Sequence, residues 1–127
     1  MNLPRAHWTV GTVTLLLFPL AGVYMRHVVG VPQLDGVTRM VFRSRFLLLL
    51  LVAVVNLALS TSKADGPIRG IASVLTLAAP FPLLIAFFVD PYRGVQGSLW
   101  SRFAMYGLFV AGALLAIANR PGGPKTP

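Results

Sequence analysis

Four long apolar stretches, none of which contains a charged residue, alternate with short polar segments along this chain. They are Trp8–Met25, Phe46–Ser62, Gly70–Val89 and Phe103–Asn119. A helix needs roughly 20 residues, and at least about 17, to cross a hydrocarbon layer about 30 Å thick. Each stretch meets that length, and Arg or Lys flanks nearly every one. The pattern therefore predicts an all-α protein, an integral membrane bundle of four transmembrane helices.

The polar flanks place the expected spans at about 8–29, 40–62, 67–90 and 98–119, within a single transmembrane domain over 1–120. The last seven residues, 121–127, hold three prolines and two glycines and are expected to form a flexible tail. An even number of spans places both termini on one side of the membrane. The first stretch could be taken for a signal peptide, but it is rather long and lacks a small-residue cleavage site. We therefore expect it to be a span.

Local signals within this frame predict a helix cap and two irregularities. Asp35 is placed to cap the second helix by accepting from the backbone N–H of Val37 or Thr38. Proline has no N–H to donate to the preceding turn, so Pro19 predicts a kink in the first span. Pro80 and Pro82 together predict a distortion of the third span between Thr76 and Pro82.

Composition agrees with a membrane protein: 56% of the residues are apolar, 11% are charged, and the mean hydropathy is +0.76. The net charge of +8 comes from bases at the ends of the spans, so lipid headgroups are the expected partner and nucleic acid is not. Anionic lipid or partner contacts are predicted for Arg26, Arg39, Arg43 and Arg45. This dense cluster favours a cytoplasmic 26–45 loop. The expected location is the bacterial inner membrane.

Polar residues inside the spans fall in the half nearer the termini. Asn56 and Ser73 should lie at similar depth on consecutive antiparallel helices and within hydrogen-bonding reach, directly or through one neighbour. Interhelical hydrogen bonding is one interpretation of these residues, and a pocket for a small ligand is the other. The candidate cofactor-binding residues are His27, Asn56, Ser73 and Thr76.

No cofactor is predicted, although haem and quinone stay open. The two histidines, His7 and His27, lie 20 residues apart and cannot ligate one haem from one chain. They are expected to be interfacial side chains. Asp90 is expected to pair with nearby Arg93 or Arg102. The chain has no cysteine, which excludes thiolate metal sites.

The fourth span carries small residues that let helix backbones approach closely. The residues assigned to helix packing are Ala104, Gly107, Ala111, Gly112 and Ala116. They could seal the bundle internally or dock another protein.

Two functional hypotheses follow. The first is a non-enzymatic accessory or structural subunit of a larger membrane complex, with other subunits or copies of itself as partners. The alternative is a small helical bundle that binds or passes a lipid, quinone or other hydrophobic ligand. The sequence contains no deep Asp or Glu that could carry a proton or cation, which weighs against a pump or an enzyme.

Overall fold

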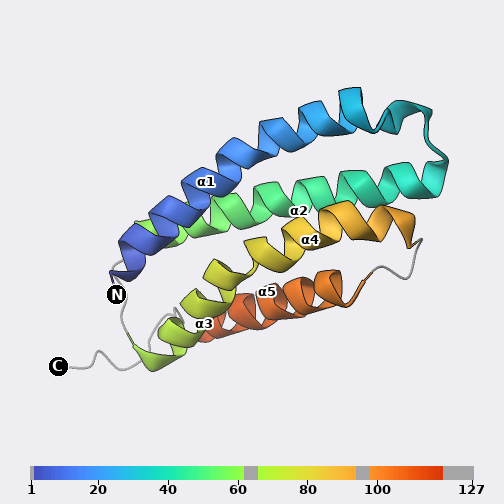
Figure 1. Ribbon diagram of the computed structural model, residues 1–127. Helices are drawn as coiled ribbons and strands as arrows, with labels where there is room; N and C mark the ends of the chain where they lie inside the picture. The colour runs from blue at the N-terminus through green and yellow to red at the C-terminus, as the bar shows by residue number, and fades with distance from the viewer. Residues whose placement is uncertain (1, 62–65, 94–97, 119–127) are drawn as a thin grey trace.

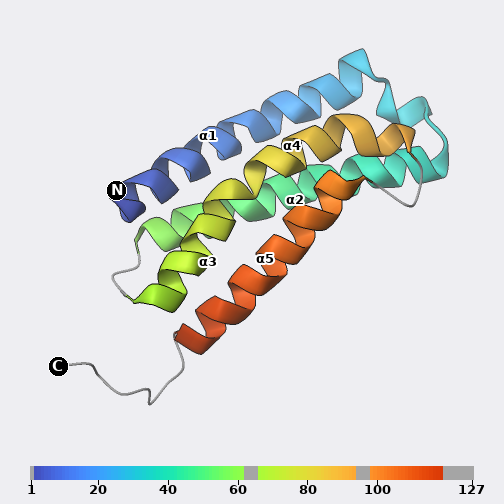
Figure 2. The ribbon, with the colours of Figure 1, turned by 60° about the horizontal axis from the view of Figure 1, so that its bottom comes forward.

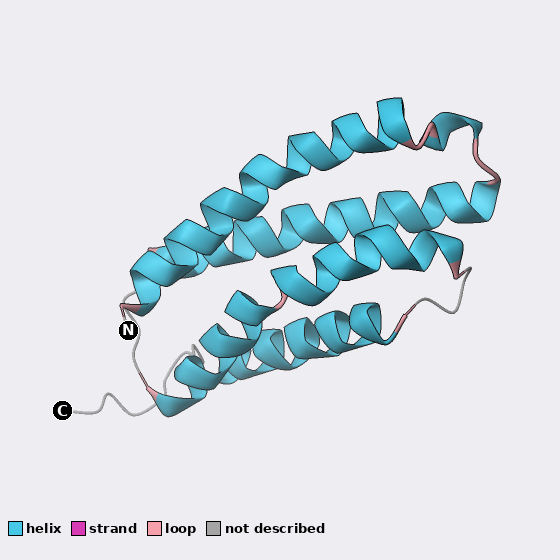
Figure 3. Cartoon of the chain, viewed as in Figure 1, coloured by secondary structure: helices cyan, strands magenta, loops and turns pink. Residues whose placement is uncertain are grey.

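The computed structural model describes residues 2–61, 66–93 and 98–118, and the predicted tail lies outside this range. The described residues are helical apart from short turns (Figure 3). The main helices are α1 (Leu3–Val23), α2 (Gly36–Ser60), α3 (Pro67–Ala78), α4 (Pro80–Val89) and α5 (Leu99–Ala118). Three short helical turns accompany them: the π-helical η1 (Tyr24–Val28) and the 3-10 turns η2 (Val31–Gln33) and η3 (Asp90–Tyr92).

Four helical segments in the described part of the chain are long and apolar enough to cross a membrane, as predicted. They are Leu3–Val28, Gly36–Ser60, Pro67–Tyr92 and Leu99–Ala118. The first span begins at Leu3 rather than at residue 8, because Pro4 suits a first helical turn and His7 lies inside the bundle. Successive spans run antiparallel, so α1 begins and α5 ends at one end of the bundle (Figures 1 and 2). We call this the terminal end and the opposite one the loop end.

The span formed by α3 and α4 is the centre of the bundle. In its most apolar 18-residue window 44% of the residues are buried, against 17% in each of the outer spans that contain α1 and α5. Helix α1 packs mainly on α2, whereas α5 packs on α3 and α4. Figure 2 shows α5 lying obliquely along this central span, so the outer helices present most of their surface to lipid.

The interior is mainly apolar toward the loop end, apart from the buried Asp90, and polar toward the terminal end. Toward the loop end, the largest buried side chains are Phe42, Leu49, Leu83 and Phe87, with Phe42 and Phe87 in edge-to-face contact at 5.6 Å. Toward the terminal end, the only buried residues of α1 are small or polar: His7, Gly11 and Thr14. Because lipid is as apolar as leucine, membrane helices associate through packing and hydrogen bonds, and these are the residues that α1 turns inward.

Among the described glycines, the closest approach to a neighbouring helix occurs at Gly11 and not in α5. A Cβ at Gly11 would lie 2.9 Å from the backbone nitrogen of Leu57 and 3.1 Å from the carbonyl oxygen of Ala53, so only glycine fits. Among the small residues of α5, Ala104 and Ala111 are buried against the bundle and Gly107 is half-buried. Gly112 and Ala116 are exposed, and a Cβ at Gly112 would have no neighbour within 4 Å.

The paired prolines interrupt the third span where they were expected to. Helix α3 ends at Ala78, a turn residue follows at position 79, and α4 begins at Pro80 (Figure 3). Ala79 keeps helical dihedral angles and donates to the Leu75 carbonyl at 3.1 Å, so the two pieces still form one span. The first span is not interrupted at Pro19. It departs from α-helical geometry only at Tyr24, where η1 begins.

The connection between the first two spans, at the loop end, begins at Gly30, whose φ of +65° lies in the left-handed region. Asp35 then caps α2 as predicted, its carboxylate accepting from the backbone N–H of Val37 and of Thr38 at 3.0 Å each. Hydrogen bonds from Thr38, first from its side chain and then from its backbone, together with that from Val37, hold the pKa of Asp35 below its ordinary value. The exposed cap therefore stays charged at neutral pH.

Asp90 joins three elements at the loop end. Its fully buried carboxylate accepts from Arg45 Nε of α2 at 2.6 Å and from the backbone N–H of Ser98, just before α5, at 2.8 Å. The expected partners were Arg93 and Arg102, but the carboxylate pairs with Arg45, which lies 45 residues earlier. The contact joins η3 and the residue before α5 to α2.

We expect Asp90→Ala to lower the free energy of unfolding by about 1–3 kcal/mol, because the partly buried Arg45 and the Ser98 N–H would both lose their acceptor. The combined replacement Asp90→Leu and Arg45→Met should recover much of that loss, since it removes both charges. Unfolding in mixed micelles, followed by circular dichroism, measures both effects. Asp35→Asn keeps a capping side chain and serves as a control with little change. Equal losses for the single and the double variant would contradict a buried pair.

Candidate functional site

A layer of polar side chains fills the bundle near its terminal end. Six of them are buried, from three helices: His7, Thr14, Asn56, Arg69, Ser73 and Thr76. Polar and ionisable side chains inside a membrane are costly unless they are paired, and they commonly mark functional positions. We call this group the polar layer.

Asn56 is the centre of the polar layer. Its Nδ2 donates to the Val52 carbonyl at 3.0 Å within α2 and to the Thr76 carbonyl at 3.2 Å across to α3. The Thr76 carbonyl is the one that Pro80 leaves without a helical donor, because proline has no N–H. Asn56 therefore repairs the backbone bond that the proline removes, inside a fully buried environment.

These two bonds also fix the tautomer of His7. Both acceptors of Asn56 Nδ2 are carbonyls, so the amide cannot be flipped, and Oδ1 must face His7 Nδ1 at 2.7 Å. Because Oδ1 only accepts, Nδ1 must carry the proton. The neutral ring then presents Nε2 as an acceptor, and this buried atom has no partner among the described residues.

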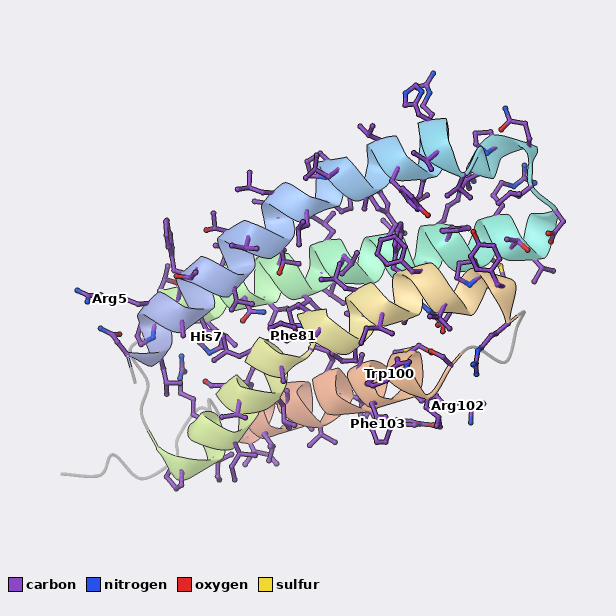
Figure 4. The ribbon with its side chains drawn as sticks, viewed as in Figure 1. Arg5, His7, Phe81, Trp100, Arg102 and Phe103 are labelled. Carbon is purple, nitrogen blue, oxygen red and sulfur yellow. The ribbon has the colours of Figure 1, made fainter. Side chains whose placement is uncertain are left out.

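Arg69 is the second incompletely bonded side chain of the polar layer. It is the third residue of α3, it is only 7% exposed, and its Nη1 has no hydrogen-bond partner among the described residues. Helices α1 and α3 are in contact, and His7 and Arg69 both lie near the terminal end of their helices. Figure 4 shows His7 on the inner side of α1, whereas Arg5, two residues earlier, points away from the bundle.

The structure brings together three of the four candidates proposed for a cofactor. Asn56, Ser73 and Thr76 lie in the polar layer, but the acceptor of Asn56 is the Thr76 carbonyl rather than Ser73. His27 is exposed in η1 at the other end of the bundle, and His7 takes the inner position instead. The sequence signal for His7 was its spacing of four and seven residues from Gly11 and Thr14, which places all three on one helical face.

The pocket described at the break around Ala79 does not include Asn56. It has a volume of about 190 Å³, faces α5 and is lined by apolar or small residues. These are Leu75, Ala78, Ala79, Pro82, Phe103, Ala104 and Gly107. The side of the break that faces Asn56 is instead joined to α2 through the Thr76 carbonyl.

A basic pocket lies at the loop end, between the end of α1 and the start of α2. It has a volume of about 270 Å³ and contains two of the predicted arginines, Arg26 and Arg43. Its remaining walls are Gly22, Met25, Val31 and Pro32. Both arginines are exposed, and neither has an acidic partner in the described part of the chain.

The other two arginines of the predicted cluster do not line this pocket. Arg39 lies at its edge and donates to the Pro32 carbonyl at 3.4 Å. Arg45 points elsewhere because residues two apart on a helix differ by about 200° in direction, and it binds Asp90. The arginines predicted to form one cluster are therefore divided between two places. Arg26 and Arg43 line the pocket, and Arg45 forms an ion pair with Asp90.

We expect Asn56→Leu to lower the free energy of unfolding by on the order of 1–3 kcal/mol, because the Thr76 carbonyl and His7 Nδ1 would lose their partners. In a Pro80→Ala background, the N–H restored at position 80 can donate to the Thr76 carbonyl. The loss caused by Asn56→Leu should then shrink by on the order of 1 kcal/mol. Unfolding in mixed micelles is measured for the wild type, both single variants and the double variant, which together form a double-mutant cycle. Strictly additive losses would show that Asn56 does not replace the missing bond.

Comparison with protein-family models, with curated proteins and with solved structures finds no match. A function for this chain therefore has to be inferred from its polar layer and its basic pocket.

Proposed function

We propose that this integral membrane protein is a non-enzymatic bundle that binds an anionic lipid in the basic pocket. The observation that carries the proposal is the pairing of Arg26 and Arg43 around one pocket with apolar walls, without an acidic partner among the described residues. A lipid phosphate combines the charge and the hydrogen-bond acceptors that two guanidinium groups bind best.

The place of the pocket suits a lipid. It lies where two predicted spans end, Leu3–Val28 and Gly36–Ser60, and therefore at the level of the headgroups. The apolar walls formed by Met25, Val31 and Pro32 can cover the first methylene groups of the lipid, each worth about 0.8 kcal/mol when buried. Arg26 projects from the π-helical turn η1, a rare geometry that is frequently found at functional sites.

We expect the double replacement Arg26→Gln and Arg43→Gln to weaken phosphatidylglycerol retention roughly 30-fold, at about 1 kcal/mol for each base. Native mass spectrometry of the full chain, with chain-matched phosphatidylcholine as competitor, measures the retained lipid. The matched control is Arg5→Gln with Arg93→Gln, which removes the same charge from two exposed positions outside the pocket. Equal retention by both double variants would show a general charge effect and contradict a site.

A second candidate is an accessory subunit that docks on α5, and one feature favours it. Gly112 lies inside the helix, where glycine is unfavourable by about 1 kcal/mol relative to alanine, and no close contact among the described residues requires it. Ala116 follows four residues later, and both residues are exposed. Small residues at this spacing let another transmembrane helix approach closely.

If a subunit docks there, Gly112→Leu should dissociate a complex of fixed stoichiometry while Ala113→Leu, one residue further around the helix, leaves it intact. Native mass after extraction from membranes in mild detergent measures this. The mass also distinguishes another subunit from a second copy of this chain. A single chain carrying only lipid, in the wild type as in both variants, would exclude the docking role.

A further inference from the structure

We propose that His7 and Arg69 form a site for the carboxyl group of a single-chain amphiphile, such as a fatty acid. The site lies at the terminal end, while the basic pocket lies at the loop end, so the two proposals are independent. The proposal begins from two buried atoms without partners among the described residues, His7 Nε2 and Arg69 Nη1.

The two atoms require opposite hydrogen-bonding roles of a ligand. Arg69 always carries its proton, so Nη1 can only donate. Asn56 holds the proton of His7 on Nδ1, so in the neutral ring Nε2 can only accept. A matching group must accept a hydrogen bond from Arg69 and donate one to His7.

A carboxyl group can accept the hydrogen bond from Arg69 and donate the one to His7, and it can also supply a negative counter-charge. One of its oxygens accepts from Nη1, while the proton on the other is donated to Nε2 or transferred to it. In either case the acid supplies the proton that Nε2 lacks. A transferred proton leaves a carboxylate next to Arg69, and a buried guanidinium requires such a counter-charge. A hydroxyl group could make both hydrogen bonds, but it would leave the Arg69 charge uncompensated.

The position of the two residues favours an amphiphile over a small soluble acid. His7 is the fifth residue of α1 and Arg69 the third residue of α3, so both lie within about 8 Å of the ends of their spans. That depth is where the headgroup of a fatty acid meets the hydrocarbon. The N-terminus of α3 has no side-chain cap, and its free N–H groups add to the attraction for an anion.

The direct test follows the imidazole nitrogens of the full wild-type chain by ¹⁵N NMR in phosphatidylcholine nanodiscs as palmitic acid is added. The chain has two histidines, and the exposed His27 at the opposite end is an internal control. We expect a saturable shift of His7 Nε2, an unchanged protonated Nδ1, and no change at His27. A His27→Gln variant assigns the signals.

Hexadecanol and methyl palmitate identify the headgroup, since they have the same chain and lack the acid. We expect neither to shift Nε2 or to displace palmitic acid. An equal response to hexadecanol would overturn the carboxyl assignment in favour of a hydroxyl site. An unchanged His7 signal at saturating palmitic acid would overturn the site altogether.

Variants test the role of the guanidinium. Arg69→Gln should weaken palmitic acid binding about tenfold or more, whereas Arg5→Gln, from the same end but pointing outward, should change it less than about twofold. Arg69→Lys keeps the charge and covers the case in which the glutamine variant does not fold. Replacing Arg26 and Arg43 should leave the shift of His7 Nε2 on addition of palmitic acid unchanged, so failure of one site is distinguishable from failure of the other. Wild-type affinity in Arg69→Gln would contradict the proposal.

Discussion

The polar half of this bundle depends on one constraint: a backbone carbonyl in a membrane interior must find a donor. Pro80 denies that donor to the Thr76 carbonyl, and Asn56 supplies it from the neighbouring helix at 3.2 Å. This bond fixes the orientation of the amide, and the amide in turn determines which nitrogen of His7 carries the proton. That His7 Nε2 is an acceptor, without a donor among the described residues, is thus a consequence of a proline two helices away.

Much of the fold could be predicted from the sequence, because lipid imposes length and apolarity on every span. The interruption of the third span and the Asp35 cap were also predictable, since each depends on residues within one or two helical turns. The matched depth of Asn56 and the third span was a usable signal, although the acceptor was a main-chain oxygen rather than Ser73. Every residue carries a main-chain carbonyl, so the residue types do not show which carbonyl will accept a side-chain hydrogen bond.

The contacts that could not be predicted join residues far apart in the chain. Arg45 looked like part of a surface cluster, yet its rotation around α2 turns it toward Asp90. His7 looked interfacial because the apolar stretch begins at Trp8, but the helix starts earlier and turns this ring inward. The close approach of α1 and α2 at Gly11 needs the backbone path of both helices, and no spacing along either one reveals it.

The two ends of the bundle use arginine in different ways, and the difference is one of solvation. Arg26 and Arg43 are exposed, so each keeps its hydration, and an anionic partner would gain a modest, salt-dependent attraction. Arg69 is largely withdrawn from water, so its guanidinium is more weakly screened and its unbonded Nη1 carries a larger penalty. A ligand at the loop end should therefore exchange with surrounding lipid and respond to salt. A ligand at the terminal end should exchange slowly and respond little to salt, because it would supply hydrogen-bond partners that His7 and Arg69 lack among the described residues.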